Sequence, residues 1–337
     1  MNNWWMIGFF FCSLFLTGAC RRYALRVHML DIPNDRSSHI TPTPRGGGIG
    51  MVLTFLAGSI LTAGSSALPP GIMTNTLLAC SLVAIIGFID DHYPLSTLLR
   101  LSVHALSSVI LLSTIEVPDL LPWTASGTHV YGLDYLILGI ALVWLLNLYN
   151  FMDGIDGIAA IEGLSVICGA LFILWINGSL EGYGSWIGIL GMSVAGFLIW
   201  NWPPAKIFMG DVGSGFLGFT LGCFAILTSV NQGINIWAWF ILLAVFIVDA
   251  TVTLLRRLCR GDRFWMAHRS HAYQILSRRY NSHAKVTFGV LLINITWLLP
   301  WAYLSTVDPF YPLFCVPAAT LPLIILVFRI GAGTTNN

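Results

Sequence analysis

Asn147-Leu-Tyr-Asn150-Phe-Met-Asp153-Gly-Ile-Asp156-Gly157 separates two apolar runs, Leu133 to Leu146 and Ile158 to Ile176. The helices expected from these runs, residues 133–149 and 158–176, have 17 and 19 residues, close to the roughly 20 that a helix needs to cross a bilayer. Two carboxylates and two carboxamides therefore lie at the junction of two hydrophobic helices. Ionisable groups are costly inside a bilayer, so this junction indicates a functional site at a membrane face. The alternative is a polar turn, because Asp is common before Gly in turns and often caps helices.

The composition supports a membrane protein. Of the 337 residues, 56% are hydrophobic and 9% are charged, whereas soluble domains carry about 25% charged residues. A soluble protein of this size could not cover its surface with so few charges. Alternation of period two is absent, which argues against a β-barrel. The seven cysteines form no CxxC motif, so neither a disulfide framework nor a zinc site is indicated.

We predict an all-α polytopic membrane protein with about eleven transmembrane helices, forming a single transmembrane domain over residues 1–337. The expected helices cover approximately residues 4–20, 47–64, 72–89, 98–115, 133–149, 158–176, 184–202, 213–230, 236–255, 286–304 and 311–330.

The basic residues predict the orientation of these helices. With eleven spans, all 16 Lys and Arg residues fall on one side. The positive-inside rule makes that side cytoplasmic, so we expect a periplasmic N-terminus and a cytoplasmic C-terminus. The cytoplasmic loops expected to carry the active site are residues 21–46, 90–98, 147–157, 201–213 and 256–285.

Adjacent carboxylates end the third expected span, at Asp90 and Asp91. Two like charges side by side are unfavourable unless a cation neutralises them. Carboxylate oxygens suit Mg²⁺, which typically takes one or two carboxylates together with substrate phosphates. The alternative is a solvated helix end.

Two further junctions contain groups that suit phosphate. Asp35 and Arg36 lie in the first cytoplasmic loop, which ends in Gly46-Gly-Gly48. Glycine amides before a helix can face a phosphate, although glycine runs also serve for close packing. Asp211 follows Gly210 and opens the eighth span, where a helix cap is the alternative role. Lys206 could meet a phosphate as a point charge.

The longest and most basic loop follows the ninth span. We expect Arg269 and His271 to contact donor phosphates, and Arg278 and Arg279 to lie on anionic lipid. Asp249, on the span before it, is left with two roles: it pairs with an Arg of its own helix or it touches the site.

These motifs resemble the polyprenyl-phosphate N-acetylhexosamine-1-phosphate transferases. The resemblance rests on Asp90-Asp91, on Asn147-x-x-Asn150-x-x-Asp153-Gly-Ile-Asp156-Gly157, and on Asn201-x-x-Pro204-Ala-Lys-Ile-Phe-Met-Gly-Asp211. It covers residues from about 31 to 280. The motif around Arg269 and His271 is more similar to the O-antigen-initiating branch than to the peptidoglycan enzyme, whose contiguous His triplet is absent.

The resemblance implies an enzyme that moves N-acetylhexosamine 1-phosphate from a UDP-sugar to undecaprenyl phosphate in the bacterial inner membrane and releases UMP. The donor would be UDP-GlcNAc or a UDP-N-acetyl-6-deoxyhexosamine, and the cofactor Mg²⁺, with Mn²⁺ as the alternative. It assigns Asp211, Asp90 and Asp91 to the metal, and Asp90 and Asp91 would also act in catalysis by arranging metal and acceptor. The remaining site candidates are catalytic Asp153, Asp156 and His271, and substrate-binding Asp35, Arg36, Asn147, Asn150, Asn201, Lys206 and Arg269.

Other readings stay open at this point. A proton-coupled transporter also carries membrane acids, but it places them near the middle of the bilayer. A CDP-alcohol phosphatidyltransferase would need Arg where Ile161 stands, and a purely structural helix bundle leaves the polar junctions unexplained. Membrane lipids are expected partners and nucleic acid is not. A homodimer through Gly and Trp residues of the outer face is left open.

Overall fold

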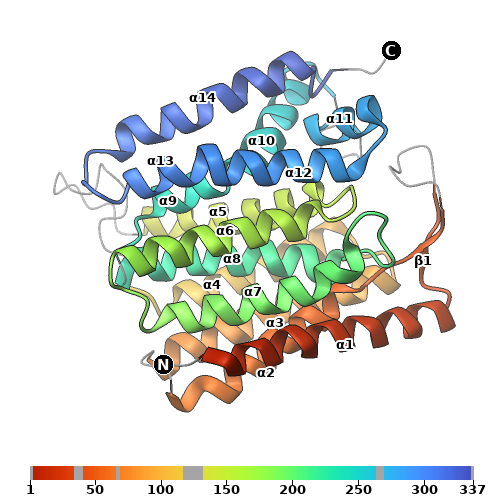
Figure 1. Ribbon diagram of the computed structural model, residues 1–337, viewed down its shortest axis with the longest axis horizontal. Helices are drawn as coiled ribbons and strands as arrows, with labels where there is room; N and C mark the ends of the chain where they lie inside the picture. Colours follow the sequence, from red (N-terminus) through yellow and green to blue (C-terminus); the bar gives the residue numbers. More distant parts are fainter. Residues whose placement is uncertain are drawn as a thin grey trace.

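The computed structural model describes residues 3–33, 41–65, 69–116, 132–231, 233–262 and 269–334. Long helices lie side by side and roughly parallel in it (Figure 1). The short helix α11, strand β1 and the C-terminal end lie at the right-hand end of these helices, and the N-terminus lies at the left. The polar junctions predicted above gather at the right-hand end.

The described residues are mostly helical. The helices are α1 (Met6–Arg26), α2 (Gly48–Thr62), α3 (Pro70–His92), α4 (Thr97–Leu112), α5 (Leu133–Met152), α6 (Ile158–Ile176), α7 (Tyr183–Asn201), α8 (Asp211–Asn231), α9 (Ile236–Leu242), α10 (Ala244–Cys259), α11 (Ala272–Tyr280), α12 (His283–Ile293), α13 (Leu299–Leu304) and α14 (Pro312–Ile330). A π-helical segment, Asn294–Leu298, joins α12 to α13. The strands are β1 (Leu30–Asp31) and β2 (Thr43–Pro44), which pair antiparallel.

The all-α membrane architecture is confirmed. Seven of the described helices are long and apolar enough to cross a membrane, or eight if the bent pair α9–α10 is one span. The shorter apolar helices α2 and α4 match two further expected spans, and α1 matches the first. The exact number of eleven spans, and the sides on which the termini lie, stay predictions.

The expected span 236–255 is not one straight helix. It consists of α9 and α10, which meet at Leu243 and are bent by 75° relative to each other. The sequence at the bend contains neither Pro nor Gly, the usual signals of a kink. Helix ends also differ: α1 continues to Arg26, so Arg21, Arg22 and Arg26 belong to a helix and not to the loop that follows it.

Helix α8 lies in the centre of the bundle. Within Asp211–Val230, 94% of the most apolar 18-residue stretch is buried, as expected for a helix that is apolar on all sides. It packs against α3 and α5. Glycine permits this close approach, because a Cβ at Gly87 of α3 would overlap the backbone of Asp211. The polar ends of α3, α5 and α8 are therefore held together.

The glycine run before α2 does not leave its amides free. The N–H groups of Gly47 and Gly48 donate to the carbonyls of Phe208 and Met209, each at 2.9 Å. A Cβ at Gly48 would also overlap the Cα of Gly213. The phosphate-binding role considered for these glycines is therefore wrong for Gly47 and Gly48, whose role is close packing of α2 against the start of α8.

Candidate active site

Asp91 caps helix α8 from a neighbouring helix. Its Oδ1 accepts from the backbone N–H of Asp211 and its Oδ2 from that of Val212, both at 3.1 Å. The side chain is 3% exposed, and Arg45 donates to its backbone carbonyl at 2.5 Å. Both oxygens of Asp91 are thus engaged with the first amides of α8, which have no partner inside their own helix.

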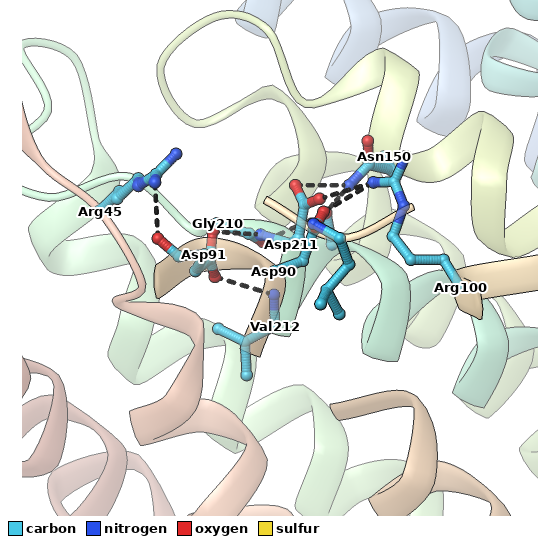
Figure 2. A network of polar contacts seen from close by, with 10 residues as sticks. Arg45, Asp90, Asp91, Arg100, Asn150, Gly210, Asp211 and Val212 are labelled. Carbon is cyan, nitrogen blue, oxygen red and sulfur yellow. Dashed lines mark hydrogen bonds and ion pairs between the residues drawn. The ribbon is translucent and has the colours of Figure 1, made fainter. Parts of the chain in front are cut away.

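Asp90, the adjacent residue, faces a different environment. Arg100 of α4 lies 2.7 Å from Asp90 Oδ2 and 3.3 Å from Asp211 Oδ2. Asn150 donates to Asp211 Oδ1 at 2.8 Å and to the Ser214 hydroxyl at 3.1 Å. Figure 2 shows Arg45 and Asp91 on one side of this network, and Arg100 and Asn150 converging on Asp211 on the other. Four helices therefore contribute side chains to one charged cluster, which consists of Asp90, Arg100, Asn150 and Asp211.

Asp153 adds a further acid beside this cluster. It follows the last residue of α5 and is partly buried. Burial raises the pKa of Asp153 well above its usual range, and the neighbouring charges of Asp211, Asp91 and Asp156 raise it further. A cation bound nearby would therefore favour the ionised form of the Asp153 side chain.

The charged cluster can hold a divalent cation only if waters or a bound substrate supply further coordinating oxygens. No group of three or more His, Cys, Asp and Glu side chains in the described ranges is assembled around a possible metal position. The Asp90 and Asp211 carboxylates do converge, and both contact the cation Arg100. This donor set fits Mg²⁺, which keeps waters and completes its shell with substrate phosphate oxygens.

A groove of about 920 Å³ opens next to the charged cluster. It lies between α3, α4, α5 and α8, and its polar lining includes Arg100, Asn147, Asn150 and Asp211. Apolar residues line most of the rest, such as Val83, Leu101, Leu112, Leu136, Ile140 and Val143. The Asp211 side chain is 34% exposed. A long apolar ligand in the groove could therefore place a charged end at the cluster.

Asn201 and Asp156 hold the surrounding loops together. Asn201 accepts from Gly157 N–H and donates to the carbonyl of Ile207, each at 3.0 Å. Asp156 Oδ2 accepts from Ala205 N–H at 3.1 Å, and its Oδ1 lies 3.2 Å from His283 Nδ1. Both residues connect the loop after α5 to the loop after α7 and position the site from outside the charged cluster.

Asp249 contacts the predicted site residue His271 and does not pair with an Arg of its own helix. Its oxygens accept from the N–H groups of Ala272 and Tyr273 at 2.9 and 3.1 Å, so it caps α11. His271 Nδ1 lies 3.5 Å from Asp249 Oδ1, and its ring stacks on Tyr273. The Tyr273 hydroxyl donates to the carbonyl of Phe151 at 2.9 Å. Asp249 and Tyr273 thus attach α11 to α10 and α5, and His271 is 2% exposed between them.

Arg269 is exposed, as a residue that binds a soluble ligand must be. Arg278 donates to the carbonyl of Arg269 at 3.0 Å. Burial and the neighbouring Arg269 charge lower the pKa of Arg278. The Arg278 side chain thus lies against the backbone of Arg269. The predicted roles, Arg269 at the site and Arg278 on the lipid surface, stay predictions.

Two sets of predicted residues lie elsewhere. Asp35 and Arg36 lie outside the described residues. Lys206 is exposed, and its ammonium group lies 5.7 Å from the centre of the Trp200 ring. It does not line the groove.

Arg100 contacts two carboxylates of the charged cluster and is not among the residues that the sequence motifs single out. It stands ten residues after Asp90, at the start of the next helix, and this position at the same membrane face was the available signal. Arg45, which contacts Asp91, was missed for the same reason.

Comparisons with known proteins agree with this geometry. Residues 73–229 match the model of glycosyl transferase family 4; this range contains all four members of the charged cluster. The chain is 27% identical over 313 residues to a probable undecaprenyl-phosphate N-acetylglucosaminyl 1-phosphate transferase of Bacillus subtilis, with 90% of this chain and 85% of the relative covered. A Thermotoga maritima undecaprenyl-phosphate alpha-N-acetylglucosaminyl 1-phosphate transferase is 27% identical over 96% of this chain and 97% of its own length. The Escherichia coli protein of the same name is 28% identical over 80% and 74% of the two chains. The charged cluster and these similarities lead to one conclusion: the chain is a multi-pass membrane protein whose residues 73–229 match glycosyl transferase family 4.

Proposed function

We propose that this protein transfers N-acetylhexosamine 1-phosphate from a UDP-sugar to undecaprenyl phosphate and releases UMP. The observation that carries the proposal is the continuity between the apolar groove and the charged cluster. One substrate has a chain that must stay in the bilayer and a phosphate that must meet a water-soluble nucleotide. A site with an apolar groove and a cationic, carboxylate-lined end suits that substrate.

The acceptor would occupy the groove with its phosphate at Arg100. This guanidinium already lies between two carboxylates, and Arg binds phosphate well because its donors are arranged as a planar fork. Gly139 of α5 lines the groove, and a Cβ there would lie 3.7 Å from the nearest atom, in Leu112. The helix can therefore take a larger residue at this position.

Gly139→Leu tests the groove directly. The leucine would remove roughly 40 Å² of apolar contact from a bound polyprenyl chain, about 1 kcal/mol at 25 cal/mol per Å². We expect the KM for undecaprenyl phosphate to rise about fivefold, with the KM for the UDP-sugar unchanged. A short-chain prenyl phosphate serves as the matched control, because it does not reach residue 139. An equal increase in KM for both acceptors would place the lipid outside this groove.

The donor would bind at the other side of the cluster. Arg278 donates to the backbone carbonyl of Arg269 on the segment that α11 positions, and the exposed Arg269 guanidinium suits a diphosphate. Asn147 and Asn150 of α5 line the groove at the cluster, where they would reach both substrates. His271 would position the segment that carries Arg269 through its contacts with Asp249 and Tyr273.

The reaction needs no general base. An oxygen of the acceptor phosphate would attack the β-phosphorus of the UDP-sugar, and the bond from that phosphorus to the bridging oxygen would break, so that UMP leaves with the oxygen. A phosphate monoester has its second pKa near 6, so the acceptor is mostly a dianion at neutral pH. This favours direct attack over a covalent aspartyl intermediate.

Asp211 and Asp90 would hold Mg²⁺, or Mn²⁺ in its place. When bound, the ion would neutralise the phosphate charges that gather as the two substrates meet. Asn150 would orient Asp211 through the 2.8 Å hydrogen bond, and Asp91 would fix the start of α8 on which Asp211 stands. Asp153 would add negative charge that the cation offsets.

The cellular setting follows from the charge distribution. All Lys and Arg residues fall on one side of the predicted topology, which favours an active site on the cytoplasmic face of the inner membrane. The donor would be UDP-GlcNAc or a UDP-N-acetyl-6-deoxyhexosamine, and the product would begin an O-antigen or a related surface glycan.

Release of UMP by the purified protein tests the function. We expect release from a UDP-HexNAc only in the presence of undecaprenyl phosphate and Mg²⁺, with transfer of radiolabel from the sugar to the lipid. Chelation by EDTA should stop the reaction, and added Mg²⁺ should restore it. UMP release without a lipid acceptor would contradict the proposal. Proton-coupled uptake into proteoliposomes, without UMP release, would favour the transporter alternative.

A further inference from the structure

Trp200 forms a fixed platform at the end of α7. Its indole N–H donates to the carbonyl of Leu14 on α1 at 2.9 Å. A Cβ at Gly18 would lie 2.9 Å from the ring, so the absence of a side chain at residue 18 leaves room for the indole against α1. The orientation of the ring is therefore set both by a hydrogen bond and by packing.

Two cations lie over this platform. The Arg21 guanidinium carbon is 5.9 Å from the centre of the Trp200 ring, and the Lys206 ammonium nitrogen is 5.7 Å from it. Arg21 Nε donates to the carbonyl of Lys206 at 3.1 Å, which leaves the two terminal nitrogens of the guanidinium for another acceptor. Within the described ranges, neither cation forms an ion pair with a carboxylate. Two like charges brought together in this way favour a bound anion.

The position of the platform indicates the source of that anion. Helix α1 is apolar up to Cys20 and becomes basic at Arg21, and Trp is enriched where a helix leaves the bilayer. On the same two helices, Phe15 of α1 and Ile199 of α7 are 71% and 55% exposed. A phosphate where the apolar part of α1 ends fits the headgroup of a phospholipid with its acyl chains along the two helices.

We propose that Arg21, Trp200 and Lys206 form a binding site for the phosphate of an anionic glycerophospholipid, separate from the groove and from the charged cluster. None of the three residues lines the groove. The site is nevertheless connected to the candidate active site, because Lys206 belongs to the loop that leads to Asp211. In this loop Lys206 N–H donates to the Trp200 carbonyl and Phe208 N–H to the Pro44 carbonyl, each at 2.8 Å. A lipid held by Lys206 stabilises this loop.

Lipid retention tests the proposal. The purified protein is extracted from nanodiscs of mixed phosphatidylglycerol and phosphatidylcholine, and bound lipid is counted by native mass spectrometry. Arg21→Gln and Lys206→Gln should each lower the apparent affinity for phosphatidylglycerol about fivefold, since a basic residue near an anionic surface contributes about 1 kcal/mol. Arg21→Lys keeps the charge and should retain most of the lipid, which separates loss of binding from loss of folding.

Arg26→Gln is the matched control. Arg26 is exposed on the same helix and lies about 140° around the helix axis from Arg21 at 3.6 residues per turn. It should change retention little. An equal loss of phosphatidylglycerol in Arg26→Gln would mean that the basic end of α1 attracts the lipid non-specifically. If the unmodified protein retained phosphatidylcholine as well as phosphatidylglycerol, the proposal that the site recognises a negatively charged lipid would be wrong.

Hydrogen exchange separates a lipid from a free anion. Phosphatidylglycerol should slow exchange of the amides of Lys206 and Phe208 in the unmodified protein and not in the Arg21→Gln, Lys206→Gln double variant. Inorganic phosphate at millimolar concentration should have little effect. If inorganic phosphate alone protects these amides to the same extent, the ligand is a soluble anion and the assignment to a lipid is wrong.

Discussion

Asp90 and Asp91 are adjacent in sequence and have opposite roles in the structure. Asp91 is buried, and both of its oxygens accept from backbone amides of α8. Asp90 meets the Arg100 side chain next to the groove. Asp249 is an acid of the same kind as Asp91, since it caps α11 with bonds to backbone amides. Asp211 is of the same kind as Asp90, since it also contacts the Arg100 side chain. Backbone amides cannot move away without unfolding a helix, whereas a side-chain cation can exchange an acid for a ligand. The acids with side-chain partners are therefore the ones available for chemistry.

Asp211→Asn should give the largest effect on activity. The substitution keeps the size of the side chain and removes the charge that a hard cation needs. We expect kcat to fall about 100- to 1,000-fold, as when one main electrostatic contact of a transition state is lost, with expression and melting temperature nearly unchanged. Turnover at increasing Mg²⁺ measures this. Unchanged turnover with the same Mg²⁺ response would remove Asp211 from the metal site.

Arg100→Gln should have the next largest effect. It removes the cation between Asp90 and Asp211 and, on the proposed function, a contact to the acceptor phosphate. The loss of a hydrogen bond to a charged group, about 1.5–3 kcal/mol, corresponds to roughly a 10- to 150-fold fall in kcat/KM for undecaprenyl phosphate. Arg100→Lys should recover part of the activity. An Arg100→Gln variant that keeps its KM for the acceptor would show that Arg100 only neutralises the two acids.

Asp91→Asn should behave in the opposite way from Asp211→Asn. An amide in place of the carboxylate can accept from only one of the two α8 amides and turns its NH₂ group toward the other. We expect a loss of about 1–3 kcal/mol in stability, measured by thermal unfolding in detergent. Activity of the remaining folded protein should fall much less than in Asp211→Asn. A larger loss of turnover in Asp91→Asn, at unchanged melting temperature, would break the division between the two kinds of acid.

Arg278→Gln should give the smallest effect. It removes an exposed hydrogen bond to the carbonyl of Arg269, and such a bond contributes about 0.5–1.5 kcal/mol, or roughly a two- to tenfold increase in the KM for the UDP-sugar. Arg279→Gln is the control, because Arg279 is an exposed neighbour of the same charge. If both variants raise the KM equally, the net charge of the segment matters and the contact with Arg269 does not.

The sequence was sufficient to predict the helices and the polar face. Long apolar runs leave few alternatives in a membrane, so the spans differ from the helices mainly at their ends. The partners of the individual acids could not be predicted. Nothing within Asp90-Asp91 says which residue meets Arg100, because that depends on how α8 packs against α3, some 120 residues later in the chain. The bend at Leu243 and the packing of Trp200 against Gly18 likewise depend on tertiary contacts.

The attachment of α11 has a consequence for protein engineering. Hydrogen bonds to other parts of the chain hold the stretch from Arg269 to Asn281. Asp249 accepts from two backbone amides of this stretch, and the Tyr273 hydroxyl donates to the carbonyl of Phe151. The N–H of Gly333 donates to the carbonyl of Ser270. Apart from the Tyr273 hydroxyl, these bonds join backbone groups of the stretch, so other side chains in it can be exchanged while the attachment is kept. The stretch can therefore be treated as a replaceable cassette: on the proposed function, transplanting its counterpart from a relative exchanges the donor-binding side chains and leaves the charged cluster in place.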